Sequence, residues 1–174
     1  MTLRSKSSAP APHGLTHLDR DNRPTMVDVS AKEVTHRTAV AEARVVLPPK
    51  VAKALRASGH RTKKGPVFDT AIIAGVMAAK RTHELIPFCH PIALEDCKIA
   101  IEWGEGNEVV VECSVRATHK TGVEMEALTG ATVAALTIYD MCKALTHGIE
   151  IRDVALLEKT GGKRDFGRAK KPSR

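Results

Sequence analysis

The chain has 174 residues, 43% of them hydrophobic, which suffices for one domain with a core but hardly for two. Its formal net charge of +7 favours an anionic partner, either nucleic acid or a phosphorylated small molecule, and an aromatic content of 3% disfavours recognition by base stacking. No run approaches the ~20 apolar residues of a membrane span, and the N-terminus has no apolar signal segment, so we expect a cytoplasmic protein.

Composition divides the chain into three parts. Residues 1–14 are small, polar and rich in proline, which predicts a disordered N-terminal tail. Residues 15–166 form a single domain, and residues 167–174 form a basic C-terminal tail. The four cysteines and eight histidines lack the spacing of a zinc site, so we predict reduced cysteines and no metal centre.

The first half of the domain is predicted to contain one strand and two helices. Apolar residues at every second position predict a strand over residues 35–47, and two prolines end it. Helices are predicted over residues 51–57 and 67–85. A basic loop at residues 60–66 separates them.

A turn and two strands come next. Two prolines stiffen the turn at residues 87–91 and hold His90 in place. Alternation of apolar residues predicts strands over residues 92–103 and 108–117, joined by a hairpin loop at residues 104–107.

A long helix and a last strand complete the domain. Residues 118–143 show helical periodicity, with a capping box of Thr121 and Glu124 at the start and Gly148 as the expected C-cap. Residues 149–157 are predicted to form a strand with a bulge near Asp153. The resulting order predicts an α+β, ferredoxin-like (βαββαβ) fold, with an antiparallel sheet and helices on one face.

Two groups of charged residues are candidates for chemistry. Asp140 and Lys143 share a helix face, either as a plain ion pair or as a pair that transfers protons. Glu126 lies fourteen residues before Asp140, about 21 Å along a continuous helix. One small substrate cannot contact both on the same helix, so either the early acids are structural or two copies of the chain build the pocket.

Several scattered cations could bind phosphate groups: Arg37, Lys64, Lys159 and Lys163. The glycine loop at residues 159–163 does not have the order of a Walker A motif. From the residues alone, Asp28 is either a turn acid or functional, His90 either a hydrogen-bonded turn histidine or functional, and Glu124 a capping residue.

Three motifs resemble the molybdenum cofactor biosynthesis protein C family: KRTHELIPFCHP, GVEMEALTGATVAALTIYDMCKA and LLEKTGGKRDF. The resemblance extends over residues 15–166. It implies the same α+β fold and a lyase reaction that converts 3′,8-cyclo-7,8-dihydro-GTP to cyclic pyranopterin monophosphate and pyrophosphate. It also implies a homo-oligomer, a hexamer built as a trimer of dimers. The resemblance implies no redox cofactor, and it is compatible with a divalent cation bound to the triphosphate.

The resemblance assigns roles to particular residues. It makes Asp140 catalytic, together with Lys143. The expected substrate-binding residues are Asp28, Arg37, Lys64, Phe88, Cys89, His90, Glu124, Met125, Glu126 and Lys159. Lys163 lies in a less certain part of the match and ranks below them.

Two other classes of function compete with this one. The ferredoxin-like order is also that of RNA-recognition domains, but no aromatic residue occurs in residues 109–117, where such a domain carries stacking side chains. A non-catalytic assembly subunit would keep its function after substitution of Lys64 or Asp140.

Overall fold

The computed structural model describes Asp21 and residues 23–168. The predicted N-terminal tail, residues 1–14, and most of the predicted C-terminal tail lie outside the described residues. Among the described helices, none is both long enough and apolar enough to cross a membrane.

Five strands form one antiparallel sheet in the order β4-β5-β1-β6-β7. The strands are β1 (Thr35–Val46), β4 (Asp96–Trp103), β5 (Glu108–His119), β6 (Glu150–Thr160) and β7 (Phe166–Gly167). A separate ribbon consists of β2 (Arg61–Thr62) and β3 (Gly65–Pro66). The order of the four long strands is that of the predicted ferredoxin-like fold, which is confirmed.

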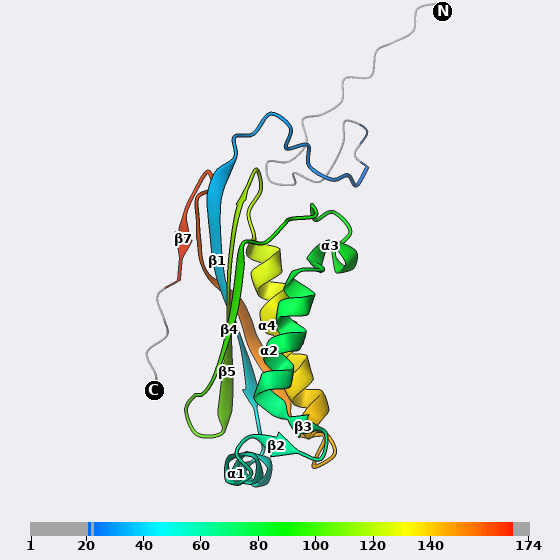
Figure 1. Cartoon of the computed structure of the whole chain (residues 1–174), viewed down its shortest axis with the longest axis vertical. Coiled ribbons are helices and arrows are strands. Elements are labelled where there is room, and N and C mark those ends of the chain that lie inside the picture. Colours follow the sequence, from blue (N-terminus) through cyan, green and yellow to red (C-terminus); the bar gives the residue numbers. More distant parts are fainter. Residues whose placement is uncertain (1–20, 22, 169–174) are drawn as a thin grey trace, which may run out of the picture.

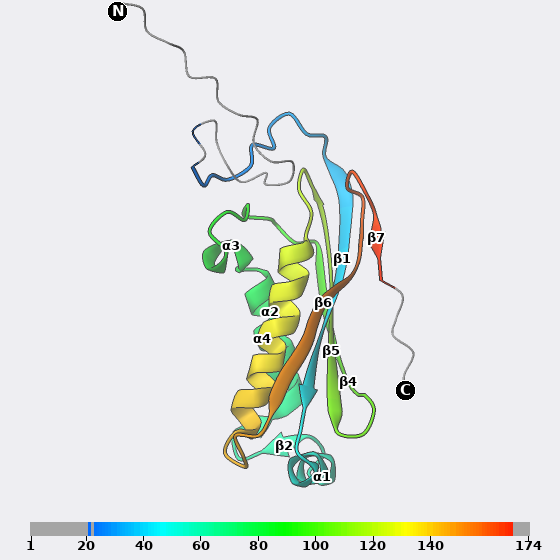
Figure 2. The same cartoon turned by 180° about the vertical axis from the view of Figure 1, so that it is seen from behind.

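The helices are α1 (Pro49–Ala57), α2 (Val67–Ala79), α3 (Thr82–Leu85) and α4 (Glu124–Cys142). The two longest, α2 and α4, lie side by side against one face of the sheet and leave the other face open (Figures 1 and 2). The predicted placement of the helices on one face is therefore correct.

The core lies between the sheet and these two helices. The alternating apolar residues of β1 and β5 are fully buried, from Ala39 to Val45 and from Val109 to Ala117. Two glycines bring the helices close. A Cβ added to Gly75 of α2 would lie 2.8 Å from the carbonyl oxygen of Gly130 in α4, and one added to Gly130 would lie 2.6 Å from Cys113 Sγ. Packing this close fixes where α4 lies on the sheet.

The prediction of one helix over residues 67–85 is wrong in one respect: the helix ends at Ala79. The buried Thr82 hydroxyl donates to the carbonyl oxygen of Ala79 at 3.0 Å. A side-chain donor of this kind competes with the backbone N–H groups that would continue the helix. The chain restarts as the short α3.

The predicted caps of the long helix are also wrong. The N-cap residue is Val123, without a side-chain cap, and the Glu124 carboxylate instead accepts a hydrogen bond from Lys159 Nζ at 2.8 Å. The helix ends at Cys142, well before the predicted cap at Gly148. A tight turn, in which the Leu145 N–H donates to the Cys142 carbonyl oxygen, takes the place of a glycine cap.

The last strand is longer than predicted and carries the expected bulge. Asp153 has a φ of 52°, and the pairing of β1 with β6 shifts register there. A second shift lies between Val40 and Ala41. Beyond it, β6 continues to Thr160, and β7 adds a strand that the sequence did not predict.

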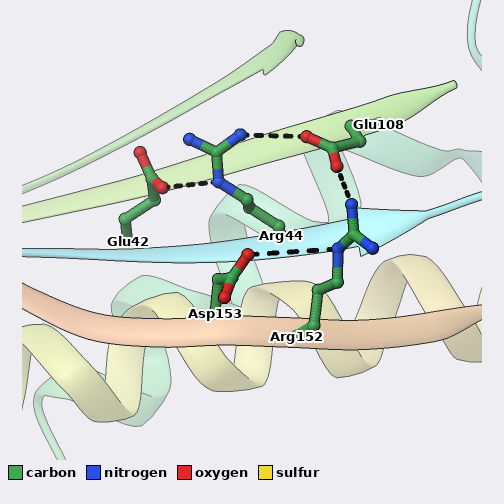
Figure 3. A network of polar contacts seen from close by, with 5 residues as sticks. All are labelled: Glu42, Arg44, Glu108, Arg152 and Asp153. Atoms are coloured by element: carbon green, nitrogen blue, oxygen red, sulfur yellow. Dashed lines mark hydrogen bonds and ion pairs between the residues drawn. The ribbon is translucent and has the colours of Figure 1, made fainter. Parts of the chain in front are cut away.

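A charged network ties three strands together on the open face (Figure 3). Arg44 of β1 lies between two carboxylates, 2.8 Å from Glu42 and 2.9 Å from Glu108 of β5. Glu108 also pairs with Arg152 of β6, which is near Asp153. Burial alone would raise the pKa of Glu108, but the hydrogen bonds from Arg152 and Arg44 outweigh it and lower the pKa.

We expect Glu108→Gln to lower the free energy of unfolding by about 1–2 kcal/mol at pH 7, because two guanidinium groups lose their shared anion. The Glu108 side chain is only 14% exposed. Because its folded pKa is lowered, this contribution is present at neutral pH and is lost as the pH falls through the folded pKa. Urea unfolding measures both effects, with the exposed Glu105→Gln as control. Equal stability of the two variants would contradict the prediction.

Candidate functional site

The predicted site residues gather at the two ends of α4. At its C-terminal end lies the Asp140 cluster, made of Lys64, Asp140 and Lys143. Lys64 Nζ is 2.6 Å from one Asp140 carboxylate oxygen, and Lys143 Nζ is 2.8 Å from the other. Lys64 also donates to the backbone carbonyl of Asp140 at 2.9 Å. Lys64 comes from the β2–β3 hairpin, 76 residues away, so helical spacing could identify only the Asp140–Lys143 pair.

The two ammonium groups determine the charge of this cluster. Hydrogen bonds from Lys143 and Lys64 lower the pKa of Asp140 to about 2, and the Asp140 carboxylate raises the pKa of Lys143. The cluster is therefore a carboxylate between two ammonium ions at neutral pH. The Asp140 side chain is 52% exposed, so within one chain the cluster is open to solvent rather than set in an apolar wall.

The Glu124 cluster lies at the other end of α4. Glu124 pairs with Lys159 of β6 at 2.8 Å, and the Arg37 guanidinium of β1 donates to the carbonyl oxygens of His119 and Lys120. Together they border a hollow of about 210 Å³. The cations lining this hollow are Lys32, Arg37, Lys120, Lys159 and Lys163. Such a concentration of positive charge suits a polyphosphate.

Two glycines let the loop after β6 close over this hollow. Gly161 has a φ of 80°, and a Cβ there would lie 1.8 Å from the carbonyl oxygen of His36. A Cβ on Gly162 would lie 2.9 Å from a guanidinium nitrogen of Arg37. Only glycine fits so close to the β1 backbone, and this close approach brings the Lys163 loop to the cluster.

Glu126 is buried next to this cluster, with 4% of its surface exposed. Burial is the main cause that raises its pKa to about 7; its own backbone N–H opposes this rise, and the charge of Glu124 adds a smaller increase. The pKa of the Cys89 thiol is raised by burial and by the Glu126 charge, which is consistent with a position of the turn at residues 87–91 near the start of α4.

The remaining predicted residues surround the same end of the helix. His90 Nε2 is 2.9 Å from the carbonyl oxygen of Val27 and so donates to it. Asp28 accepts from the Ser30 backbone N–H at 2.8 Å, a turn geometry that lowers its pKa, with Lys120 adding a smaller effect. Phe88, two residues before His90, and Met125, between Glu124 and Glu126, have partly exposed side chains.

The structure does not bring all predicted residues together in one chain. Because α4 is a continuous helix from Glu124 to Cys142, Glu126 and Asp140 are separated by about 21 Å of helical rise. Lys64 therefore lies far from Arg37 and Lys159 within one chain. Lys32 and Lys120 were missed by the sequence analysis, because cations on separate loops show no spacing pattern. Within residues 23–168 and Asp21, no three His, Cys, Asp or Glu side chains are placed to hold a metal ion.

Comparison with known proteins gives one consistent family. The family model described as "MoaC family" matches residues 26–162. A cyclic pyranopterin monophosphate synthase of Xanthomonas campestris is 59% identical over 156 residues, covering 90% of this chain and 94% of that protein. The molybdenum cofactor biosynthesis bifunctional protein of Synechocystis is 49% identical over 86% of this chain and 44% of its own length. The molybdenum cofactor biosynthesis protein 1 of Dictyostelium discoideum is 48% identical over 85% of this chain and 26% of its own length.

The raised pKa of Glu126 predicts an effect of pH on stability. The carboxyl binds its proton more tightly in the folded state, so the free energy of unfolding should fall by about 2 kcal/mol as the pH rises from 4.5 through 7. Glu126→Gln should remove this component. Urea unfolding between pH 5 and 8 measures it, with the exposed Glu105→Gln as control, and an unchanged slope in Glu126→Gln would refute the assignment.

Proposed function

The chain belongs to the MoaC family, and on that premise we propose that it is a cyclic pyranopterin monophosphate synthase of molybdenum cofactor biosynthesis. Its reaction would convert 3′,8-cyclo-7,8-dihydro-GTP to cyclic pyranopterin monophosphate and pyrophosphate. The observation that carries the proposal is the Asp140 cluster, in which residues from two distant segments form a carboxylate held between two ammonium groups.

The phosphate groups need cations that are oriented before the substrate arrives. In the Glu124 cluster, Lys159 is held by Glu124 and Arg37 by backbone carbonyls, so both are fixed toward the hollow. We propose that these residues, with Lys64, hold the triphosphate and offset the charge that develops on the leaving pyrophosphate. Lys32, Lys120 and Lys163 add to the same positive field.

The proton transfers fall to the Asp140 cluster. Lys143 is protonated at neutral pH and can donate to the rearranging ring. Asp140 is a weak base while both ammonium groups contact it. When phosphate draws Lys64 away, Asp140 loses one of its two cations, its pKa rises, and it becomes able to accept a proton. Glu126 and His90 would position the base and the sugar.

We propose that the complete site is shared between two copies of the chain. One copy would supply the Glu124 cluster and the other the Asp140 cluster. Exposed apolar side chains lie on the outer side of the helix layer, with Ile73 and Met77 on α2 and Leu136 on α4. Burying them against a second, antiparallel copy would place opposite ends of the two α4 helices side by side. A hexamer, as a trimer of dimers, would contain such pairs.

The open face of the sheet argues against RNA binding. The hollow on this face, about 860 Å³, is net acidic, because its lining has more carboxylates than guanidinium groups, and it therefore repels phosphate groups. The charged lining residues are Glu42, Glu102, Glu112 and Asp153, with Arg44 and Arg168. Val110 and Ala100 occupy central positions in this lining, where RNA-binding domains carry stacking aromatic side chains. Trp103 also lines the hollow, but it is the last residue of β4 and its indole N–H is bonded to His60.

We expect Lys64→Ala to lower the rate of cyclic pyranopterin monophosphate formation by about 10²-fold, because a positioned cation is lost from the developing pyrophosphate and from Asp140. Lys53→Ala, on the exposed side of α1, removes the same charge away from the site and should retain the wild-type rate. Product formation is measured by chromatography, with circular dichroism to verify folding. Wild-type turnover in folded Lys64→Ala would remove Lys64 from the mechanism.

A shared site also predicts complementation. Asp140→Ala and Glu126→Ala chains should each be inactive alone, but an equal mixture assembled from unfolded chains should regain about a quarter of wild-type activity. Half of randomly formed pairs would be mixed, and each mixed pair would contain one intact site out of two. Mass spectrometry should verify mixed oligomers. Mixed oligomers without activity would show that the site lies within one chain.

A further inference from the structure

The loop that carries Lys64 is held at its base as well as at its tip, where Lys64 contacts Asp140. We call residues 60–66, with β2 and β3, the Lys64 hairpin. It contains three neighbouring cations, Arg61, Lys63 and Lys64, which repel one another. At its base, the His60 N–H donates to the Leu55 carbonyl oxygen at 2.9 Å, and the His60 carbonyl oxygen accepts from Val67 N at 2.8 Å. His60 is thus the residue from which the hairpin leaves the domain and to which it returns.

Side chains from two other elements contact the His60 ring, and a third side chain packs on one of them. The Trp103 indole N–H of β4 donates to His60 Nε2 at 3.0 Å. The Phe68 ring of α2 stacks on the imidazole, with ring centroids 4.3 Å apart and planes at 19°. The Arg56 guanidinium of α1 covers the Trp103 ring, 3.9 Å from its centroid. Because Nε2 accepts this bond, the ring proton is on Nδ1.

The backbone of His60 indicates that these contacts matter. His60 has a φ of 62°, in the left-handed region that disfavours residues with a Cβ. Such a conformation persists only where surrounding contacts enforce it, and it occurs preferentially beside functional groups. His60 directly precedes the strand that leads to Lys64, since β2 begins at Arg61.

We propose that His60 is a positioning residue: by accepting the Trp103 N–H, its ring fixes the base of the Lys64 hairpin so that Lys64 reaches Asp140 and the substrate phosphates. This inference rests on the proposed function, because it assumes that Lys64 contacts phosphate. The Trp103–His60 bond and the Lys64–Asp140 pair lie at the two ends of one short hairpin, so loosening the first should spread the positions of the second.

Two variants break the same bond from opposite sides. Trp103→Phe keeps an aromatic ring beneath Arg56 but removes the N–H donor. His60→Gly removes the ring and accepts a φ of 62° without strain. Arg61→Lys is the matched control, because it keeps the charge of the hairpin and leaves the bond intact. Since the two variants act independently, loss of folding in one leaves the other as the test.

Calorimetry with inorganic pyrophosphate on the assembled protein measures the effect without turnover. We expect Trp103→Phe and His60→Gly each to weaken binding about fivefold and to raise KM by a similar factor with a smaller change in kcat. The double variant should be no weaker than the weaker single one, because both remove one interaction. Trp103 is the only tryptophan in the chain, so its emission in folded His60→Gly should also shift, whereas Lys64→Ala should leave it unchanged.

The outcomes separate this inference from the proposed function. If Lys64→Ala weakens pyrophosphate binding while folded Trp103→Phe and His60→Gly bind as the wild type does, His60 has no positioning role and the proposed function is unaffected. Additive losses in the double variant also overturn the inference. If Lys64→Ala binds pyrophosphate as the wild type does, the assignment of Lys64 to phosphate fails, and this inference fails with it.

Discussion

The unbroken course of α4 is the constraint on which the site depends. The helix is continuous from Glu124 to Cys142, and glycine contacts with α2 and β5 hold it close to its neighbours. It therefore holds the Glu124 cluster and the Asp140 cluster at a fixed separation. In the mechanism that we propose, each cluster alone lacks half of what the reaction needs, since one has most of the cations assigned to the phosphates and the other has the pair assigned to proton transfer. A second copy of the chain is the simplest way to bring both to one substrate.

Both clusters use a carboxylate to orient lysines. Asp140 holds Lys64 and Lys143, and Glu124 holds Lys159. Without these acids, flexible ammonium groups would spread over many rotamers, and ordering them would weaken phosphate binding. The acids also compete with the ligand, so a single weak anion gains little by displacing them. A triphosphate, which contacts several cations together, gains enough, and this favours polyphosphate substrates over simple anions.

The features that follow from local pattern could be predicted from the sequence. Alternating small residues identified β1 and β5, and the motifs around Asp140 identified the family. The errors occur where a distant partner decides the local structure. Glu124 has the spacing of a capping residue, but Lys159, 35 residues away, takes its carboxylate. Likewise, the contact of Lys64 with Asp140 spans 76 residues, and nothing in either segment alone encodes it.

The two irregularities of β6 show how far the site depends on register. Before Asp153, β6 pairs Arg152 with Arg44, and a regular continuation would place Lys159 opposite Arg37. One extra residue would shift Lys159 by one position and turn its side chain to the open face, away from Glu124. The second register shift adds another residue and turns it back, so that Lys159 pairs with Ala39 on the helix face. Neither bulge alone could deliver this cation to the cluster. Together they move it two residues along β1 and keep it facing α4, which is why both must occur in the same strand.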